Sequence, residues 1–100
     1  MDEKTRYDEG MKTRRAVLGA AYVDKASAGV TDFNGEWQEF ITRTAWNDIW
    51  NRPGLIRRER SIIVLAIAAS LGAWGEFRIH VRGAINNGLS REEIKEVLLQ

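Results

Sequence analysis

Cysteine is absent from this 100-residue chain, and histidine and proline each occur once. Without cysteine, the chain can form no disulfide and no thiolate zinc site, and Cys-x-x-Cys peroxidase or other thiol redox chemistry is excluded. Any catalytic role for a side chain that titrates near neutral pH therefore depends on the one histidine, His80.

A long hydrophobic run is also missing. The most apolar stretch, Ile62 to Ala69, is too short to span a bilayer, and the charged start MDEKTRYDEG lacks the apolar region of a signal peptide. The 15 basic and 14 acidic residues nearly balance and form no basic stripe. We expect a soluble, cytoplasmic protein that binds neither nucleic acid nor membrane.

The residues that are present suit one compact domain over 1–100, with 44% hydrophobic and 29% charged residues. A domain of this size buries a modest fraction of its surface, so association between subunits is a source of extra burial. The four tryptophans are compatible with a subunit interface and equally with the core.

Glycine and proline divide the chain into helical patterns. A first helical face ends at Gly19 and a short helix ends near Gly29. A longer helix, capped by Thr31 or Asp32, must end before Pro53.

Three further helices are predicted after the NRPGL turn. The segment RRERSIIVLAIAASLG is apolar on all sides, which is typical of a helix in the centre of a bundle, and it ends at Gly72. The next helix carries Phe77, Val81, Ala84 and Ile85 on one stripe. A last helix opens with the capping box of Ser90 and Glu93. No alternating strand pattern occurs, so the predicted class is all-α.

Glu76 and His80 stand four residues apart, so on a helix they share one face. The carboxylate would favour the protonated imidazole. By spacing alone the pair is better explained as a surface ion pair than as a catalytic site. A metal site is weaker still, because no second histidine or cysteine completes a ligand set, and Ser61 has no nucleophile elbow around it.

Arg57, Arg58 and Arg60 crowd the start of an apolar helix, where the positive end of the helix dipole disfavours cations. Anion binding would explain this placement. A solvated cap paired with Glu59 or another acid explains it equally well.

Four blocks of the sequence resemble the 4-carboxymuconolactone decarboxylases, a branch of the alkylhydroperoxidase-like superfamily, in order and approximate spacing. The blocks are GMKTRRAVLG, DFNGEWQEFITRTAWNDIWNRPGL, RERSIIVLAIAASLG and HVRGAINNGLSREEIKEVLLQ. In the peroxidase branch, two cysteines precede the histidine by four and seven residues. Glu76 and Ala73 hold those positions here, so thiol peroxidase activity is not expected.

The resemblance implies a multi-helix orthogonal bundle of the alkylhydroperoxidase-like type, assembled into homo-oligomers such as hexamers or trimers. It implies decarboxylation of 4-carboxymuconolactone to β-ketoadipate enol-lactone in protocatechuate catabolism, without metal or other cofactor. His80 is then expected to be the general acid with Glu76 beside it, and Arg58, Arg60 or Arg82 to bind the carboxylates of the lactone substrate.

Family members continue past the equivalent of Gln100, so the resemblance also implies that this chain lacks their C-terminal segment. Two alternatives follow. One is a non-catalytic helical relative that keeps only the oligomeric scaffold. The other is a superfamily enzyme that acts on another small unsaturated acid.

Overall fold

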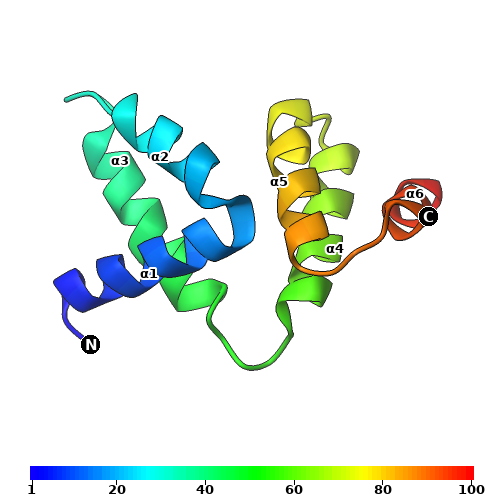
Figure 1. Cartoon of the computed structure of the whole chain (residues 1–100), viewed down its shortest axis with the longest axis horizontal. Coiled ribbons are helices and arrows are strands. Elements are labelled where there is room, and N and C mark those ends of the chain that lie inside the picture. Colours follow the sequence, from blue (N-terminus) through cyan, green and yellow to red (C-terminus); the bar gives the residue numbers. More distant parts are fainter. The chain divides into compact units, whose positions relative to one another are not determined.

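The computed structural model describes residues 1–100, and all of its regular elements are helices (Figure 1). In chain order they are α1 (Glu3–Leu18), α2 (Ala20–Ala28), α3 (Gly35–Ile41), η1 (Thr42–Ile49), α4 (Arg57–Ser70), α5 (Trp74–Asn86) and α6 (Arg91–Leu99). The predicted all-α class is confirmed.

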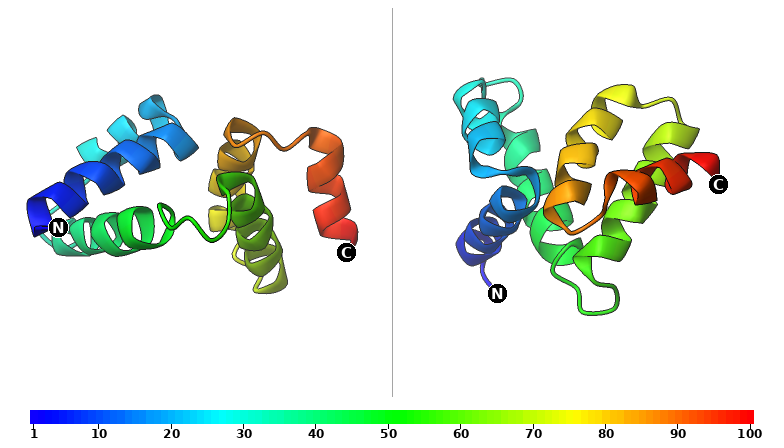
Figure 2. Two further views of the ribbon diagram at one scale, coloured as in Figure 1. Left: turned by 90° about the horizontal axis from the view of Figure 1, so that it is seen from below. Right: turned by 45° about the vertical axis from the view of Figure 1, so that its right-hand side comes forward.

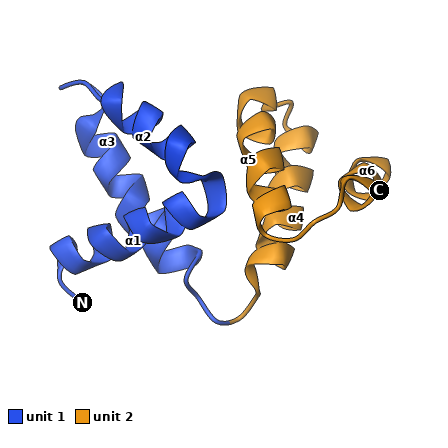
Figure 3. Ribbon diagram, viewed as in Figure 1, with its two compact units in different colours: residues 1–53 blue, residues 54–100 orange.

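The contacts group the residues into two compact units, 1–53 and 54–100, coloured separately in Figure 3. The boundary falls in the NRPGL turn that the sequence predicts. A single domain over 1–100 stays a prediction. None of the helices combines the length and the apolar character needed to cross a membrane.

The first two helices of unit 1 end where the sequence predicts. The Asp2 side chain accepts a hydrogen bond from the backbone N–H of Thr5, which satisfies one of the free donors at the start of α1. Gly19 separates α1 from α2 with a φ of 93°, a conformation that glycine adopts without steric cost. The α2 helix is followed by Gly29, as predicted.

Helix α1 crosses η1 at very short range. A Cβ atom built on Gly10 would lie 2.0 Å from the Thr42 carbonyl oxygen, so only glycine allows this approach. An ion pair between Arg6 and Asp48, with Nη2 and Oδ2 2.5 Å apart, ties the same two helices together. The crossing therefore fixes the geometry of unit 1.

The third predicted helix differs from expectation at its start and in the geometry of its second half. Its regular part begins at Gly35, and the Thr31 hydroxyl instead caps the preceding turn by accepting from the Asn34 N–H at 3.4 Å. Its second half, η1, is a π-helix, in which the Trp50 N–H donates to the Ala45 carbonyl five residues back. The helix ends before Pro53, as predicted.

The four tryptophans divide evenly. Trp46 and Trp50 are buried and stack with ring centroids 5.2 Å apart. Trp37 and Trp74 are exposed, each beside a phenylalanine.

In unit 2, α4 and α5 form an antiparallel hairpin, and α6 packs against both (Figure 2). Leu65, Ala84 and Leu89 form the centre of its core, with Phe77 and Val81 packed around them. The predicted stripe on α5 is thus confirmed for Phe77, Val81 and Ala84, but it is wrong for Ile85, which is 56% exposed. The Ser90–Glu93 capping box is also present, with both reciprocal hydrogen bonds formed.

The prediction that α4 is central and buried all round is wrong within unit 2. Only Ser61, Leu65 and Ala68 are buried on it, whereas Ile67 is 54% exposed. Within unit 2, the hairpin covers one face of α4, and the apolar side chains Ile63 and Ile67 on it stay exposed.

Candidate functional site

The centre of the candidate site is a pair of side chains on α5. The Nε2 atom of His80 lies 3.8 Å from Oε2 of Glu76, one helical turn upstream. The spacing of four residues brings both groups onto one face, as predicted. The separation is that of an ion pair and is too long for a hydrogen bond.

The two groups differ sharply in burial. The His80 side chain is 10% exposed, whereas that of Glu76 is 66% exposed. Burial lowers the pKa of His80 below its ordinary value of 6.5, and the nearby Glu76 carboxylate opposes this by raising it. The effect of Glu76 has the predicted sign, but burial outweighs it, so the free protein holds a mainly neutral imidazole at pH 7.

Arg58 is engaged within unit 2. Its guanidinium forms an ion pair with the carboxylate of Glu93. Glu93 also accepts from the Ser90 N–H in the capping box of α6. Arg58 therefore links the start of α4 to the start of α6, and it would have to leave Glu93 to bind a substrate.

A polar contact fixes how α4 and α5 lie along each other. The Asn87 side-chain amide donates to the buried Ser61 hydroxyl at 2.9 Å and approaches the Arg57 carbonyl at 3.4 Å. His80 precedes Asn87 by seven residues, so it lies roughly 10 Å along the hairpin from the start of α4. Ser61 is thus a packed structural residue.

The remaining two predicted arginines come from different helices. Arg60 belongs to the start of α4, at the level of Asn87. Arg82 is exposed and follows His80 by two residues, so it points away from the face that His80 and Glu76 share. Unit 2 thus brings Glu76 and His80 together, whereas Arg58 is held at Glu93.

No group of three or more His, Cys, Asp or Glu side chains is placed to hold a metal ion. Sequence reasoning missed one further residue. Arg14 lines a separate cavity in unit 1, and nothing in the sequence distinguishes it from its exposed neighbour Arg15.

The family model and the relatives that match this chain point to the same family. Residues 35–100 match the model of the carboxymuconolactone decarboxylase family. The chain is 40% identical, over 99% of its own length and 74% of the relative's, to 4-carboxymuconolactone decarboxylase of Acinetobacter baylyi.

Two more relatives have related names. Nitrosuccinic acid decarboxylase npaB of Metarhizium robertsii is 46% identical over 93% of this chain and 65% of its own length. A 4-carboxymuconolactone decarboxylase sequence of Pseudomonas putida is 62% identical over 48% of this chain and 100% of its own length. No solved structure matches the chain significantly.

The family match covers about two thirds of the chain, and the Acinetobacter relative aligns with almost all of it. The chain belongs to the carboxymuconolactone decarboxylase family.

Proposed function

We propose that this protein is a carboxy-lyase that converts 4-carboxymuconolactone to β-ketoadipate enol-lactone. The observation that carries the proposal is the 40% identity to a 4-carboxymuconolactone decarboxylase along essentially the whole chain. The neutral, buried imidazole beside an exposed carboxylate supplies a group that can move a proton.

The substrate itself explains why no cofactor is required. Its departing carboxylate sits on a carbon conjugated through a double bond to the lactone carbonyl. When the carbon–carboxylate bond breaks, CO2 leaves and the electron pair spreads into that carbonyl as a dienolate. One proton added to the α-carbon gives the enol-lactone and balances the reaction. The protein must therefore bind two carboxylates, stabilise an oxyanion and deliver one proton.

His80 is the proposed general acid, and Glu76 sets its charge and orientation. The lowered pKa leaves few imidazolium ions in the free protein. A dianionic substrate next to His80 would raise that pKa, because opposite charge favours the protonated form. Binding of the substrate thus charges the acid that its decarboxylation needs. The competing assignment makes Glu76 the proton donor and His80 the binding group.

Arg60 and Arg82 are the proposed carboxylate ligands, and Arg58 could join them only by leaving Glu93. A guanidinium binds a carboxylate through two parallel N–H···O contacts, which holds the substrate in a fixed orientation. Arg60 lies about two turns along the hairpin from His80. A clamp that includes it therefore suits the substrate carboxylate remote from the reacting carbon.

The homo-oligomer, the orthogonal bundle type and a cytoplasmic location are part of the same proposal. The exposed apolar side chains of α4, Ile63 and Ile67, together with Leu71 after its end, support association. An uncovered apolar face of this kind is typical of an interface between copies.

Turnover of the purified lactone tests the function directly. We expect loss of its ultraviolet absorbance and release of one CO2 per molecule. Absence of turnover by a well-folded oligomer that also fails to bind the lactone would favour the non-catalytic alternative.

A different acid is the second candidate, favoured by the 46% identity to a nitrosuccinic acid decarboxylase. A nitro group can accept the electron pair of a decarboxylation as a lactone carbonyl does. Both acids belong in one assay panel, and the larger kcat/KM identifies the substrate.

A further inference from the structure

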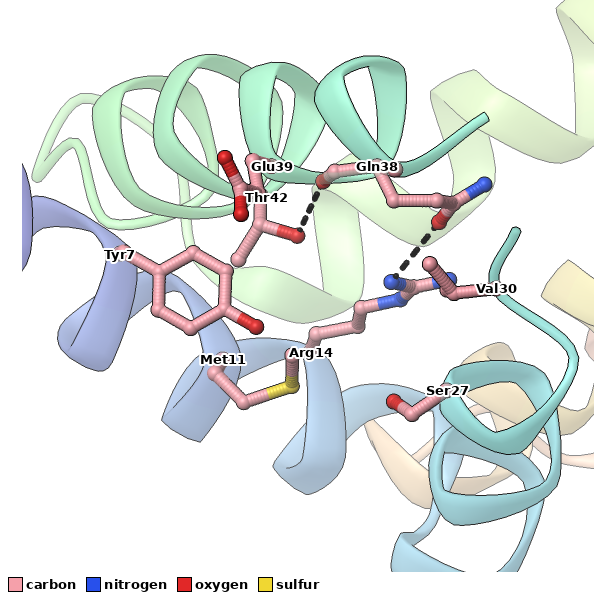
Figure 4. A pocket seen from close by; sticks show the side chains of 9 residues that line it. Tyr7, Met11, Arg14, Ser27, Val30, Gln38, Glu39 and Thr42 are labelled. Atoms are coloured by element: carbon pink, nitrogen blue, oxygen red, sulfur yellow. Dashed lines mark hydrogen bonds between the residues drawn. The ribbon is translucent and has the colours of Figure 1, made fainter. Parts of the chain in front are cut away.

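Unit 1 contains a cavity that the proposed chemistry does not use. It has a volume of about 180 Å³, roughly six times the volume that one water molecule occupies in the liquid. Tyr7, Met11 and Arg14 enter it from one face of α1, and Gln38 faces them from α3 (Figure 4). The space suits a small molecule and no larger ligand.

Arg14 is the unusual residue in this cavity. It is 8% exposed, and the one hydrogen bond of its side chain joins Nη1 to the Gln38 side-chain oxygen at 3.3 Å. Its Nε is buried and has no hydrogen-bond partner. The two other arginines of α1 are paired, Arg6 with Asp48 and Arg15 with Asp24.

A buried guanidinium without a carboxylate partner is costly, because a neutral amide oxygen replaces little of the lost hydration. An anion in the cavity would supply the missing partner. The Tyr7 and Ser27 hydroxyls also line the space, whereas the Thr42 hydroxyl already donates to the Gln38 carbonyl at 2.7 Å.

The carboxylate of Glu39, an exposed residue, lines the same cavity but forms no ion pair with Arg14. The Glu39 carboxylate would repel a second negative charge in the cavity, so the site suits a ligand with one carboxylate there. We propose that the Arg14 cavity binds one carboxylate group of a small organic acid, with the guanidinium as its cationic partner. The acid is either the molecule that reacts or a separate one, and the proposal stands without the proposed reaction.

Nitrogen-15 NMR of the arginine side chains tests the site with acetate as the probe. A buried Nε–H exchanges slowly with water, so the Arg14 signal is observable and reports on its surroundings. We expect this signal to move saturably with acetate and not with chloride at equal ionic strength.

Three variants sharpen the test. Arg14→Gln should weaken acetate binding at least tenfold. Lys12→Gln, which removes the same charge from an exposed position on α1, should leave it unchanged. Ser27→Leu should fill the mouth of the cavity and abolish the Arg14 shift while the helical circular dichroism stays the same. This variant decides the matter if Arg14→Gln does not fold.

Equal shifts with acetate and chloride, or unchanged acetate affinity in Arg14→Gln, would overturn the proposal. The source of the ligand follows from kinetics. Competitive inhibition of turnover by acetate that disappears in Arg14→Gln assigns the cavity to the reacting acid, and acetate binding at Arg14 without such competition assigns it to a separate acid. Because binding is measured without turnover, failure of the proposed reaction leaves this test intact.

Discussion

The Glu76 carboxylate lies 3.8 Å from the His80 imidazole, yet the carboxylate faces solvent and the imidazole is buried. Burial and charge therefore act on His80 in opposite directions, and burial prevails. The acid–base behaviour of the site depends on this imbalance.

His80→Ala should lower kcat by about 10²–10⁴-fold, the usual contribution of general acid catalysis, without loss of helical structure. Glu76→Gln should do less, because it only removes the charge that raises the pKa of His80. Stopped-flow turnover of the lactone measures both. A His80→Ala enzyme with normal kcat and raised KM would instead support Glu76 as the donor.

Stability should fall as the medium becomes acidic. The folded-state pKa of His80 is below the ordinary value of 6.5, so the unfolded chain takes up a proton first as the pH drops. The free energy of unfolding should therefore decrease from pH 6.5 downward, until folded His80 is also protonated. Urea unfolding of the wild type and of His80→Gln at several pH values below 6.5 isolates the contribution of His80. A wild-type free energy of unfolding that rises relative to the variant as the pH falls would contradict the prediction.

Alanine variants of the three arginines should fall into two groups, one with a raised KM and one with lowered stability. Arg60→Ala and Arg82→Ala should raise KM by roughly 10- to 150-fold, equivalent to about 1.5–3 kcal/mol of lost charged hydrogen bonds. Arg58→Ala should mainly lower stability, by about 0.2–1 kcal/mol, because its pair with Glu93 is partly exposed. Steady-state kinetics and a double-mutant cycle with Glu93→Ala measure these effects. Unchanged KM and kcat in all three variants would refute the clamp.

Gly10→Ala should destabilise the protein by at least about 1–3 kcal/mol, since its Cβ would meet the Thr42 carbonyl at 2.0 Å. Gly75→Ala is the matched control within a helix. A Cβ there meets nothing within 4 Å, so we expect a stabilisation of up to about 1 kcal/mol. Thermal unfolding measures the stability of both variants. Similar melting temperatures for the two would show that the crossing of α1 and η1 is not tight.

Ser61→Ala should cost about 1–3 kcal/mol, because it leaves the Asn87 amide without its buried acceptor. The value of kcat should not change if Ser61 is purely structural. Ser70→Ala, at the exposed end of α4, should be close to neutral. A large fall in kcat with unchanged stability would assign Ser61 a chemical role.

Local chemistry explains which features could be predicted. The ends at Gly19 and Gly29, the capping box at Ser90 and the Glu76–His80 contact each depend on residues within one turn of each other. The exposed face of α4 and the alignment of Asn87 with Ser61 depend on partners far along the chain. A helix that is apolar all round, such as α4, carries no pattern that says which face its neighbours cover.

The η1 segment changes how the sequence of this helix should be compared with others. Each turn of a π-helix takes up more residues than an α turn, so a wheel drawn at α-helical spacing assigns the wrong faces beyond Thr42. Deleting one residue between Thr42 and Ile49 would let the hydrogen bonds return to four-residue spacing, while the α1 contact at Gly10 stays in place. Single-residue gaps in alignments of this helix therefore belong within η1, where the backbone can absorb them.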